Sequence, residues 1–221
     1  MLYYSYFFLL GQPREEDTLQ AVLNESRAHQ DIVVAEFQDS YRNLTLKTVT
    51  CMRWLATRCP DAKYFLKTDD DVWVDVDNLL ATLKQFSNQL RTSLGGVCRS
   101  VVVIRDTLSK WYASKDEFPA DSYEPYCSGT GYVGSLHLAK RVAEIYVKVP
   151  YFHLEDVYMG MCLKALGYNT ILLPRFDNTA APNEDNCKIK TGGFVTIHKV
   201  PTERMEQIHN STCIKKKLTR Q

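Results

Sequence analysis

The chain has 221 residues, of which 45% are hydrophobic and 24% charged, and its formal net charge is +1. This length predicts one globular domain with a core of its own. Charges so nearly balanced exclude a general attraction to nucleic acid or to anionic lipid, so we expect no nucleic-acid partner. We expect a single domain over residues 1–213, and we interpret the lysine-containing end, residues 214–221, as a solvated basic tail.

Strand-like and helical segments alternate over the first 90 residues. In chain order the pattern predicts a buried strand over Tyr3–Leu10, a helix over 15–29, a strand over Ile32–Phe37, a helix over 45–58, a strand over Tyr64–Lys67, and an amphipathic helix capped by Asp77 and carrying Leu79, Leu83, Phe86 and Leu90. This alternation favours an α/β fold with a central, mostly parallel sheet flanked by helices.

The second half of the chain is less regular. The pattern predicts a strand over Val97–Ile104, a functional loop over 105–131, a strand over Tyr132–Ser135, a helix over His137–Val147, a helix over Glu155–Leu166 ended by Gly167, a strand over Thr170–Leu173 and a strand-like run over Gly193–Ile197. Aromatic, polar and Pro/Gly positions crowd the predicted loop, which is typical of a region that carries function.

Cysteines and glycosylation triplets indicate the compartment. The seven cysteines form no C-x-x-C pair, which argues against a zinc ribbon or a thioredoxin-type site. Their number predicts two or three disulfides in an oxidising compartment, and the alternative is a cytosolic protein with buried free cysteines. Asn24, Asn43 and Asn210 each begin an N-glycosylation triplet, which favours the secretory pathway. The apolar run Tyr3–Leu10 is too short to cross a bilayer and is no signal peptide, so the chain looks cut at its N-terminus.

An acidic triplet, Asp69-Asp70-Asp71, follows the strand predicted over Tyr64–Lys67. Ligands of open α/β sheets collect beyond the carboxyl ends of strands, and residues two apart in an extended segment share a face. Adjacent carboxylates repel one another unless a cation compensates, and such oxygens suit Mn²⁺ or Mg²⁺ bridging to a diphosphate. The alternative is a loop or capping cluster. An EF-hand is excluded, because Val74 and Leu80 stand where glycine and glutamate are required.

A second carboxylate pair, Glu155-Asp156, opens a predicted helix. Capping is one interpretation. The other is a general base, since transfer of a group to a hydroxyl needs a residue to take its proton, and the helix start favours an ionised carboxylate. His198 ends a strand-like run and is either structural or an imidazole ligand beside the metal candidate.

At this point the sequence resembles a family, the β-1,3-glycosyltransferases that include β-1,3-galactosyltransferases and β-1,3-N-acetylglucosaminyltransferases. The resemblance covers about residues 6 to 209, and its specificity comes from the shared order of the matching blocks. These blocks are 8–11, 31–33, 37–48, 62–72, 110–112, Tyr123 with 125–133, and 155–160.

The resemblance implies a GT-A-type nucleotide-binding fold and a Golgi type II membrane enzyme with a lumenal catalytic domain. It implies a UDP-hexose donor, with galactose favoured over N-acetylglucosamine, and an acceptor glycan on a glycoprotein or glycolipid. By residue it implies Asp69, Asp70 and Asp71 as the metal and nucleotide motif, Asp71 and His198 as metal ligands, Asp156 as base, and a substrate-binding set of Lys110, Trp111, Tyr112, Tyr126, Ser128, Gly129 and Glu155.

The implied mechanism is direct displacement, in which Asp156 deprotonates the acceptor 3-hydroxyl and the anomeric centre inverts to a β linkage. One departure bears on this: the family's basic segment with an arginine and a Thr-Trp pair is absent ahead of Phe8, as is the membrane anchor. We interpret the chain either as a fragment without its first strand or as a protein with impaired donor binding. A non-catalytic secretory chaperone or glycan-binding protein on the same scaffold is the alternative.

Overall fold

The structure is a computed structural model that describes residues 4–180 and 184–213. The first residue of the predicted strand Tyr3–Leu10 and the predicted basic tail, residues 214–221, therefore lie outside the described residues. The assignment of a single domain to residues 1–213 stays a prediction. Among the described residues, no helix is long and apolar enough to cross a membrane.

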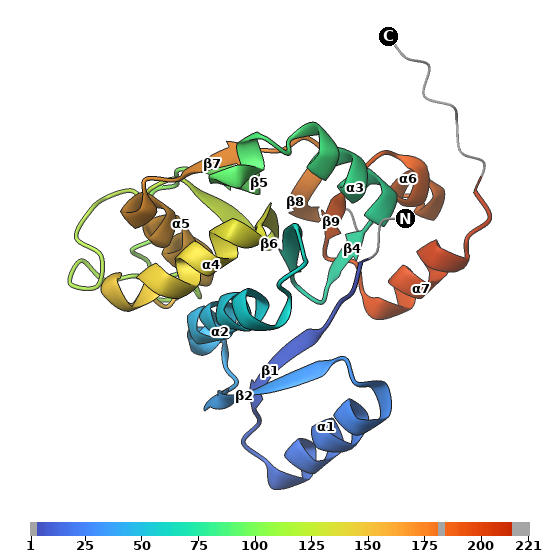
Figure 1. The fold of residues 1–221 in the computed structure, drawn as a ribbon, viewed down its shortest axis with the longest axis horizontal. Helices are drawn as coiled ribbons and strands as arrows, with labels where there is room; N and C mark the ends of the chain where they lie inside the picture. Colours follow the sequence, from blue (N-terminus) through green and yellow to red (C-terminus); the bar gives the residue numbers. More distant parts are fainter. Residues whose placement is uncertain (1–3, 181–183, 214–221) are drawn as a thin grey trace.

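Helices and strands alternate along the chain (Figure 1). The strands are β1 (Phe8–Gln12), β2 (Ile32–Gln38), β3 (Tyr64–Thr68), β4 (Val72–Val74), β5 (Ser93–Arg99), β6 (Tyr126–Ser135), β7 (Asn169–Leu172), β8 (Phe176–Ala180) and β9 (Thr196–His198). The helices are α1 (Glu16–His29), α2 (Leu44–Arg58), α3 (Val76–Gln85), α4 (Leu136–Ile145), α5 (Glu155–Leu166), α6 (Asn186–Thr191) and α7 (Thr202–Asn210).

The α/β class is confirmed, but the strand pairing differs from the expectation of one mostly parallel sheet. The central sheet has the order β3-β6-β5-β7, in which β6 runs antiparallel to both β3 and β5 and only β5-β7 is parallel. β1-β2 and β4-β9-β8 form two further small sheets. The reason is β6, which returns across the middle of the sheet after a long loop instead of a crossover helix.

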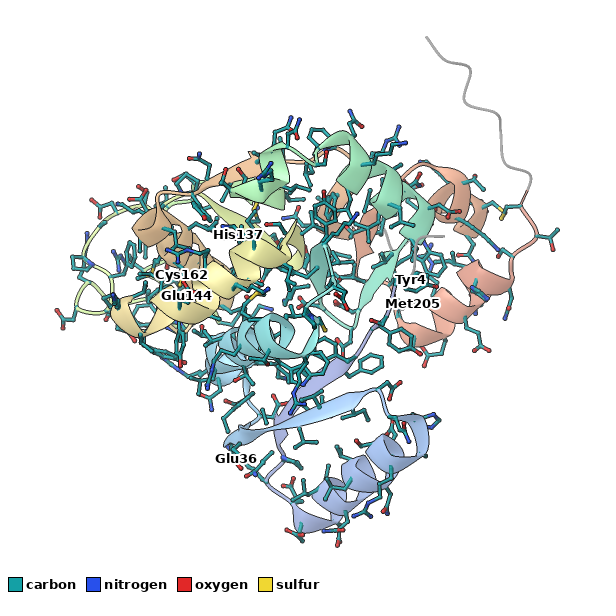
Figure 2. All side chains as sticks on the ribbon, viewed as in Figure 1. Tyr4, Glu36, His137, Glu144, Cys162 and Met205 are labelled. Carbon is teal, nitrogen blue, oxygen red and sulfur yellow. A yellow bond between two sulfur atoms is a disulfide. The ribbon has the colours of Figure 1, made fainter. Side chains whose placement is uncertain are left out.

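The first two strands and α1 form a lobe below α2 (Figure 1). β1 and β2 are parallel, and Gly11 fits there because a side chain would stand 2.7 Å from Phe37 O. The expected buried strand begins late and is poorly covered, since Tyr6 is 67% exposed and Phe8 52% exposed. α1 has no buried residue, so its apolar face toward the sheet is only half covered. Figure 2 shows Glu36 of β2 well apart from Cys162 of α5.

The main core lies between β6 and helices α2, α4 and α5 (Figure 1). Its fully buried side chains include Met52, Tyr132, Leu138, Val142, Met159 and Cys162. Burial of each methionine, leucine or valine among them stabilises the fold by ~1.5–3 kcal/mol relative to an exposed position. α5 packs closely on the start of β6, since a side chain at Gly160 would stand 2.9 Å from Tyr126 Cβ. This packing places the first turn of α5 beside the end of the central sheet.

Glycines explain why two strand boundaries were predicted wrongly. β6 begins at Tyr126, six residues before the expected Tyr132, because the Ser128–Gly131 segment looks like a loop in sequence but is extended. β5 lies at Ser93–Arg99 instead of Val97–Ile104. There Gly96 allows the close approach of β6, since a Cβ would stand 2.7 Å from Gly131 O.

Helix α5 and its end agree with the prediction, and Gly167 adopts φ +68 as the left-handed cap. The expected cap of α3 was wrong, because the Asp75 carboxylate, and not that of Asp77, accepts the hydrogen bond from Asn78 N at 2.8 Å. Four short elements were not predicted, namely β4, β8, α6 and α7. They lack a long apolar repeat, so periodicity gave no signal for them.

Two disulfides are present among the described residues, which agrees with the predicted number. Cys98–Cys127 joins β5 to β6, and Cys187–Cys213 joins α6 to the segment after α7. Cys51, Cys59 and Cys162 are free thiols. The first disulfide fixes the register of the strand that leads into the loop carrying the predicted substrate residues.

We expect Asp75→Ala to lower the free energy of unfolding by about 1 kcal/mol, because it removes the acceptor at the start of α3. Denaturant unfolding followed by circular dichroism measures this change. The matched Asp75→Asn variant keeps an acceptor and should unfold close to the wild type. Equal stability of the alanine variant and the wild type would show that the cap contributes nothing.

Candidate active site

The two acidic motifs lie at the same end of the central sheet. β3 ends at Thr68, and the triplet Asp69–Asp71 follows directly before β4. Thr68 pairs with Gly131 of β6, and its hydroxyl donates to Thr130 O at 2.9 Å. The Glu155-Asp156 pair opens α5, where Gly129 N donates to Asp156 Oδ2 at 3.3 Å. β6 therefore joins the two motifs side by side.

The pairing of β4 with β9 brings Asp71 and His198 together. Val72 pairs with His198, and Val200 N donates to Asp71 O at 2.8 Å. His198 Nε2 then lies 3.3 Å from Asp71 Oδ2, and the imidazole is largely buried while the carboxylate is 46% exposed. The two residues were predicted as metal ligands, and they are neighbours in space although 127 positions separate them in the sequence.

This donor pair fits Mn²⁺ or Mg²⁺ only if a ligand completes the coordination. No group of three or more His, Cys, Asp or Glu side chains that could hold a metal occurs within residues 4–180 and 184–213. Such cations are usually held by one or two carboxylates together with substrate phosphates and water. A half-exposed carboxylate beside a largely buried imidazole matches that arrangement, and the exposed Asp70 directly precedes Asp71 in the chain.

Asp156 is held in place by two backbone donors. Val157 N donates to its Oδ1 at 2.9 Å, and Gly129 N to its Oδ2. The side chain keeps some contact with solvent but is surrounded by protein on most sides. Burial and then the neighbouring Glu155 carboxylate raise the pKa of Asp156 to about 7, against the opposite effect of the two N–H groups and Lys67. A carboxylate with this pKa is suited to take up a proton near neutral pH.

Glu155, which precedes Asp156, is more deeply buried and only 6% exposed. Its Oε2 accepts from Thr48 Oγ1 at 3.0 Å and from Tyr132 OH at 3.1 Å. Its Oε1 lies 3.1 Å from Lys67 Nζ, in an ion pair that is not aligned as a hydrogen bond. The predicted substrate-binding residue Glu155 is thus turned into the protein, where its partners are other side chains.

The predicted residues of β6 line the same place. Burial and then Asp156 raise the pKa of Tyr126 to about 12, so this phenol stays protonated beside the carboxylate. Ser128 Oγ lies 3.1 Å from Thr130 Oγ1. Gly129 leaves the space that Glu155 occupies, since a Cβ there would stand 2.5 Å from Glu155 Oε1.

The loop between β5 and β6 is ordered by one residue that the sequence analysis missed. Arg105 donates to four carbonyl groups, those of Ala113, Ser114, Phe118 and Ala120, at 2.6 to 2.8 Å. A planar guanidinium can satisfy several acceptors at once, which makes a long loop rigid. The loop carries Lys110, Trp111 and Tyr112, three of the predicted substrate residues.

A second missed residue, Tyr41, connects this loop to the acidic motifs. The Lys110 ammonium lies 5.3 Å from the centre of the Tyr41 ring and 4.8 Å from that of Trp111. Burial and then the charge of Asp156 raise the pKa of Tyr41. Tyr41 is 44% exposed and Trp111 is 49% exposed. Together they present aromatic surface to solvent beside the candidate base.

The rest of the predicted set is less central. The Tyr112 backbone lies against the imidazole of His153, whose pKa is lowered by burial. A cavity of about 250 Å³ opens there, lined by Arg42, Asn43, Glu117, Tyr151, Phe152 and His153. The proposed glycosylation sites are placed on α1 (Asn24), just before α2 (Asn43) and at the last residue of α7 (Asn210), and their modification stays a prediction.

The family model described as Galactosyltransferase matches residues 3–174 of the 221-residue chain. The chain belongs to the galactosyltransferase family. This confirms the resemblance that the sequence blocks indicated, and the matched range contains both acidic motifs. His198 lies beyond the matched range.

Named members of the galactosyltransferase family align over much of the chain. Beta-1,3-galactosyltransferase 1 of Homo sapiens and of Mus musculus is 39% identical over 212 residues, which are 96% of this chain and 64% of that protein. Beta-1,3-galactosyltransferase 5 of Gorilla gorilla gorilla is 42% identical over 160 residues, 72% of this chain and 54% of that protein. The chain thus spans less than two thirds of the length of these relatives. A glycosyltransferase involved in the glycosylation of the major capsid of PBCV-1 matches with a TM-score of 0.36 at 13% identity, over 93% of this chain and 99% of that chain, and we draw nothing from it.

We expect Gly129→Ala to destabilise this family member by about 1–3 kcal/mol, because the added Cβ overlaps the buried Glu155 carboxylate. Denaturant unfolding measures the change. Ser128→Ala is the matched control, since it removes only a hydroxyl 3.1 Å from Thr130 Oγ1 and should cost about 1 kcal/mol or less. If both variants unfold alike, the close approach of Gly129 and Glu155 does not constrain the site.

Proposed function

We propose that the protein is an inverting glycosyltransferase that moves galactose from UDP-galactose to the 3-hydroxyl of an acceptor glycan in β linkage. The observation that carries the proposal is the position of Asp156. It is a carboxylate with a pKa raised to about 7, at the same end of the sheet as the triplet that includes Asp71. Membership of the galactosyltransferase family and the names of the relatives support the choice of reaction and sugar.

On the donor side, Asp71 and His198 would hold Mn²⁺ or Mg²⁺, with Asp69 and Asp70 beside the nucleotide. Bound there, the cation would neutralise charge on the diphosphate of the leaving UDP. Asp71 is exposed enough to reach a ligand, while the largely buried His198 is fixed by β9 and lies 3.3 Å from Asn178 O through Nδ1. The contact through Nδ1 leaves Nε2 turned toward Asp71.

On the acceptor side, Asp156 accepts the proton of the 3-hydroxyl as that oxygen bonds to the anomeric carbon. The bond from the anomeric carbon to the phosphate oxygen breaks, UDP leaves, and the proton later passes from Asp156 to solvent. One carboxylate is enough for a single inverting displacement. Val157 N and Gly129 N keep the carboxylate oriented throughout, so little reorganisation is needed.

The acceptor sugar would lie on the aromatic surface of Tyr41 and Trp111. Both rings are about half exposed and Tyr41 stands near Asp156. Apolar faces of sugars pack on such rings, while Lys110 holds the two rings in one arrangement. The acceptor class remains the one expected from the family, a glycan on a glycoprotein or glycolipid.

The proposed location is the Golgi membrane, with the catalytic domain on the lumenal side. The two disulfides fit an oxidising compartment, and the triplets at Asn24, Asn43 and Asn210 are potential glycosylation sites there.

We expect Asp156→Asn to abolish transfer, measured as UDP release from UDP-galactose with an acceptor, while UDP binding persists. In the wild type the base must be ionised, so kcat/KM should rise with pH up to about 7 and fall tenfold for each unit below it. A turnover rate of Asp156→Asn within tenfold of the wild type would contradict the assignment, as would an inactive wild-type protein.

Stability provides the control for this variant. Because the folded protein raises the pKa of Asp156, ionisation costs folding free energy, and the wild type loses stability as pH rises from the unfolded value of about 3.9 toward about 7. Asp156→Asn removes that cost but keeps one acceptor for the two N–H donors, so the two effects offset each other and the variant should still unfold cooperatively, at a temperature close to that of the wild type at pH 8. Lost activity in this variant therefore reports chemistry and not unfolding.

We expect Asp71→Asn and His198→Gln each to weaken Mn²⁺ binding at least tenfold, because each removes one of two protein ligands. Titration of Mn²⁺ in the presence of UDP, followed by calorimetry, measures this. Asp177→Asn, on β8 in the same small sheet, is the control and should bind Mn²⁺ as the wild type does. Unchanged Mn²⁺ binding in both ligand variants would exclude this site.

A further inference from the structure

We propose that Lys67 is the positioning residue of the site, whose ammonium joins the Asp69 carboxylate, the Gly129 carbonyl and the Glu155 carboxylate and thereby fixes Asp156 relative to the acidic triplet. The inference rests on the proposed function and names a residue for it outside the predicted set. Lys67 Nζ lies 2.7 Å from Asp69 Oδ1, 2.6 Å from Gly129 O and 3.1 Å from Glu155 Oε1.

The environment of Lys67 keeps it charged and immobile. The residue belongs to β3, where it pairs with Tyr132, and its side chain is 19% exposed. Burial by itself lowers the pKa of Lys67, but Glu155 and then Asp69 reverse this effect and raise it. The ammonium therefore stays protonated at every pH at which an enzyme would work. With three protein oxygens around it, it has its donors turned away from substrate.

Asp156 depends on Lys67 along two short routes. The first runs through residue Gly129, whose carbonyl accepts from Lys67 and whose N–H, in the preceding peptide group, donates to Asp156 Oδ2. The second runs through Glu155, which precedes Asp156 in the first turn of α5 and pairs with Lys67. Both routes begin at one ammonium, so its loss should move the base as well as change its charge surroundings.

Glu155 explains why a cation is required at this point. Its carboxylate is buried between Thr48 and Tyr132, and burial followed by Glu155 itself raises the pKa of Tyr132 well above its usual value, so the phenol remains a donor. Without Lys67 a buried anion would stand beside Asp156 with no cation to offset it. The charged or titratable groups that act on Asp156 from the elements around it are Glu155, Lys67, Tyr41, Tyr123 and Tyr126.

The test uses Lys67→Met, which keeps the length of the side chain and removes its charge, with the full protein and UDP-galactose. We expect kcat to fall at least tenfold, KM for UDP-galactose to change less than threefold, and the acid limb of the kcat/KM profile to move up by one pH unit or more. Lys67→Arg, which keeps the charge, should leave the acid limb within about 0.3 units of the wild type. Lys164→Met, on the exposed side of α5, is the control for a lost ion pair and should leave all three quantities unchanged.

A double variant guards against loss of folding. Lys67→Met/Glu155→Gln removes both charges of the buried pair, so it should melt above Lys67→Met and return the acid limb toward the wild-type position. The inference is overturned if Lys67→Met raises KM with kcat and the acid limb unchanged, which would make Lys67 a donor-phosphate ligand. It is also overturned if the double variant keeps the shifted limb. A wild-type protein without turnover would instead reject the proposed function, and this role with it.

Discussion

One ammonium group holds the site together. Lys67 stands near the end of β3 and contacts oxygens of Asp69 in the turn after β3, of Gly129 in β6 and of Glu155 in α5. The carboxylates at this end of the sheet repel one another, and the cation makes their proximity tolerable. The sheet order serves this arrangement, because β6 lies between β3 and β5 and its small residues admit both the ammonium and the Glu155 carboxylate. The close packing at Gly129 and the ion pair of Lys67 with Glu155 therefore depend on each other.

The raised pKa of Asp156 reflects burial and negative charge that Lys67 offsets only in part. Burial and then Glu155 raise the pKa of Asp156 to about 7, and the two backbone N–H groups and Lys67 offset only part of that effect. This is the carboxylate that we propose takes the proton, while the Glu155 carboxylate accepts from Thr48 and Tyr132 inside the protein. The two adjacent carboxylates of this helical turn thus differ in their surroundings, because Glu155 is paired with the side chains of Thr48, Tyr132 and Lys67 while Asp156 is held by two backbone N–H groups and keeps some contact with solvent.

The sequence predicted which acidic residues and histidine lie near one another better than it predicted the sheet, and the roles of these residues stay predictions. Asp69–Asp71, Glu155-Asp156 and His198 were found because carboxylates and an imidazole next to apolar runs are conspicuous, and the order of the motif blocks placed them in a family. The extent of β6 was missed, since Ser128–Gly131 has the composition of a loop. It is extended because other segments of the same chain pack closely against its glycines. The four carbonyls bound by Arg105 lie in a loop without periodicity, so nothing in the sequence marks that arginine.

The sequence itself marks Lys67 as a residue that needs a partner. In the run Tyr64–Thr68 it is the one charged side chain, and a charge in a half-buried strand requires a partner. The nearest acidic residue, Asp69, is two positions away and on the same side of the strand, which explains one contact. Glu155 is 88 positions away and could be found only through the pairing of β3 with β6 and the packing of α5 on β6. The local sequence therefore determines the two acidic motifs, and the topology of the fold determines that Lys67 reaches a carboxylate of each motif.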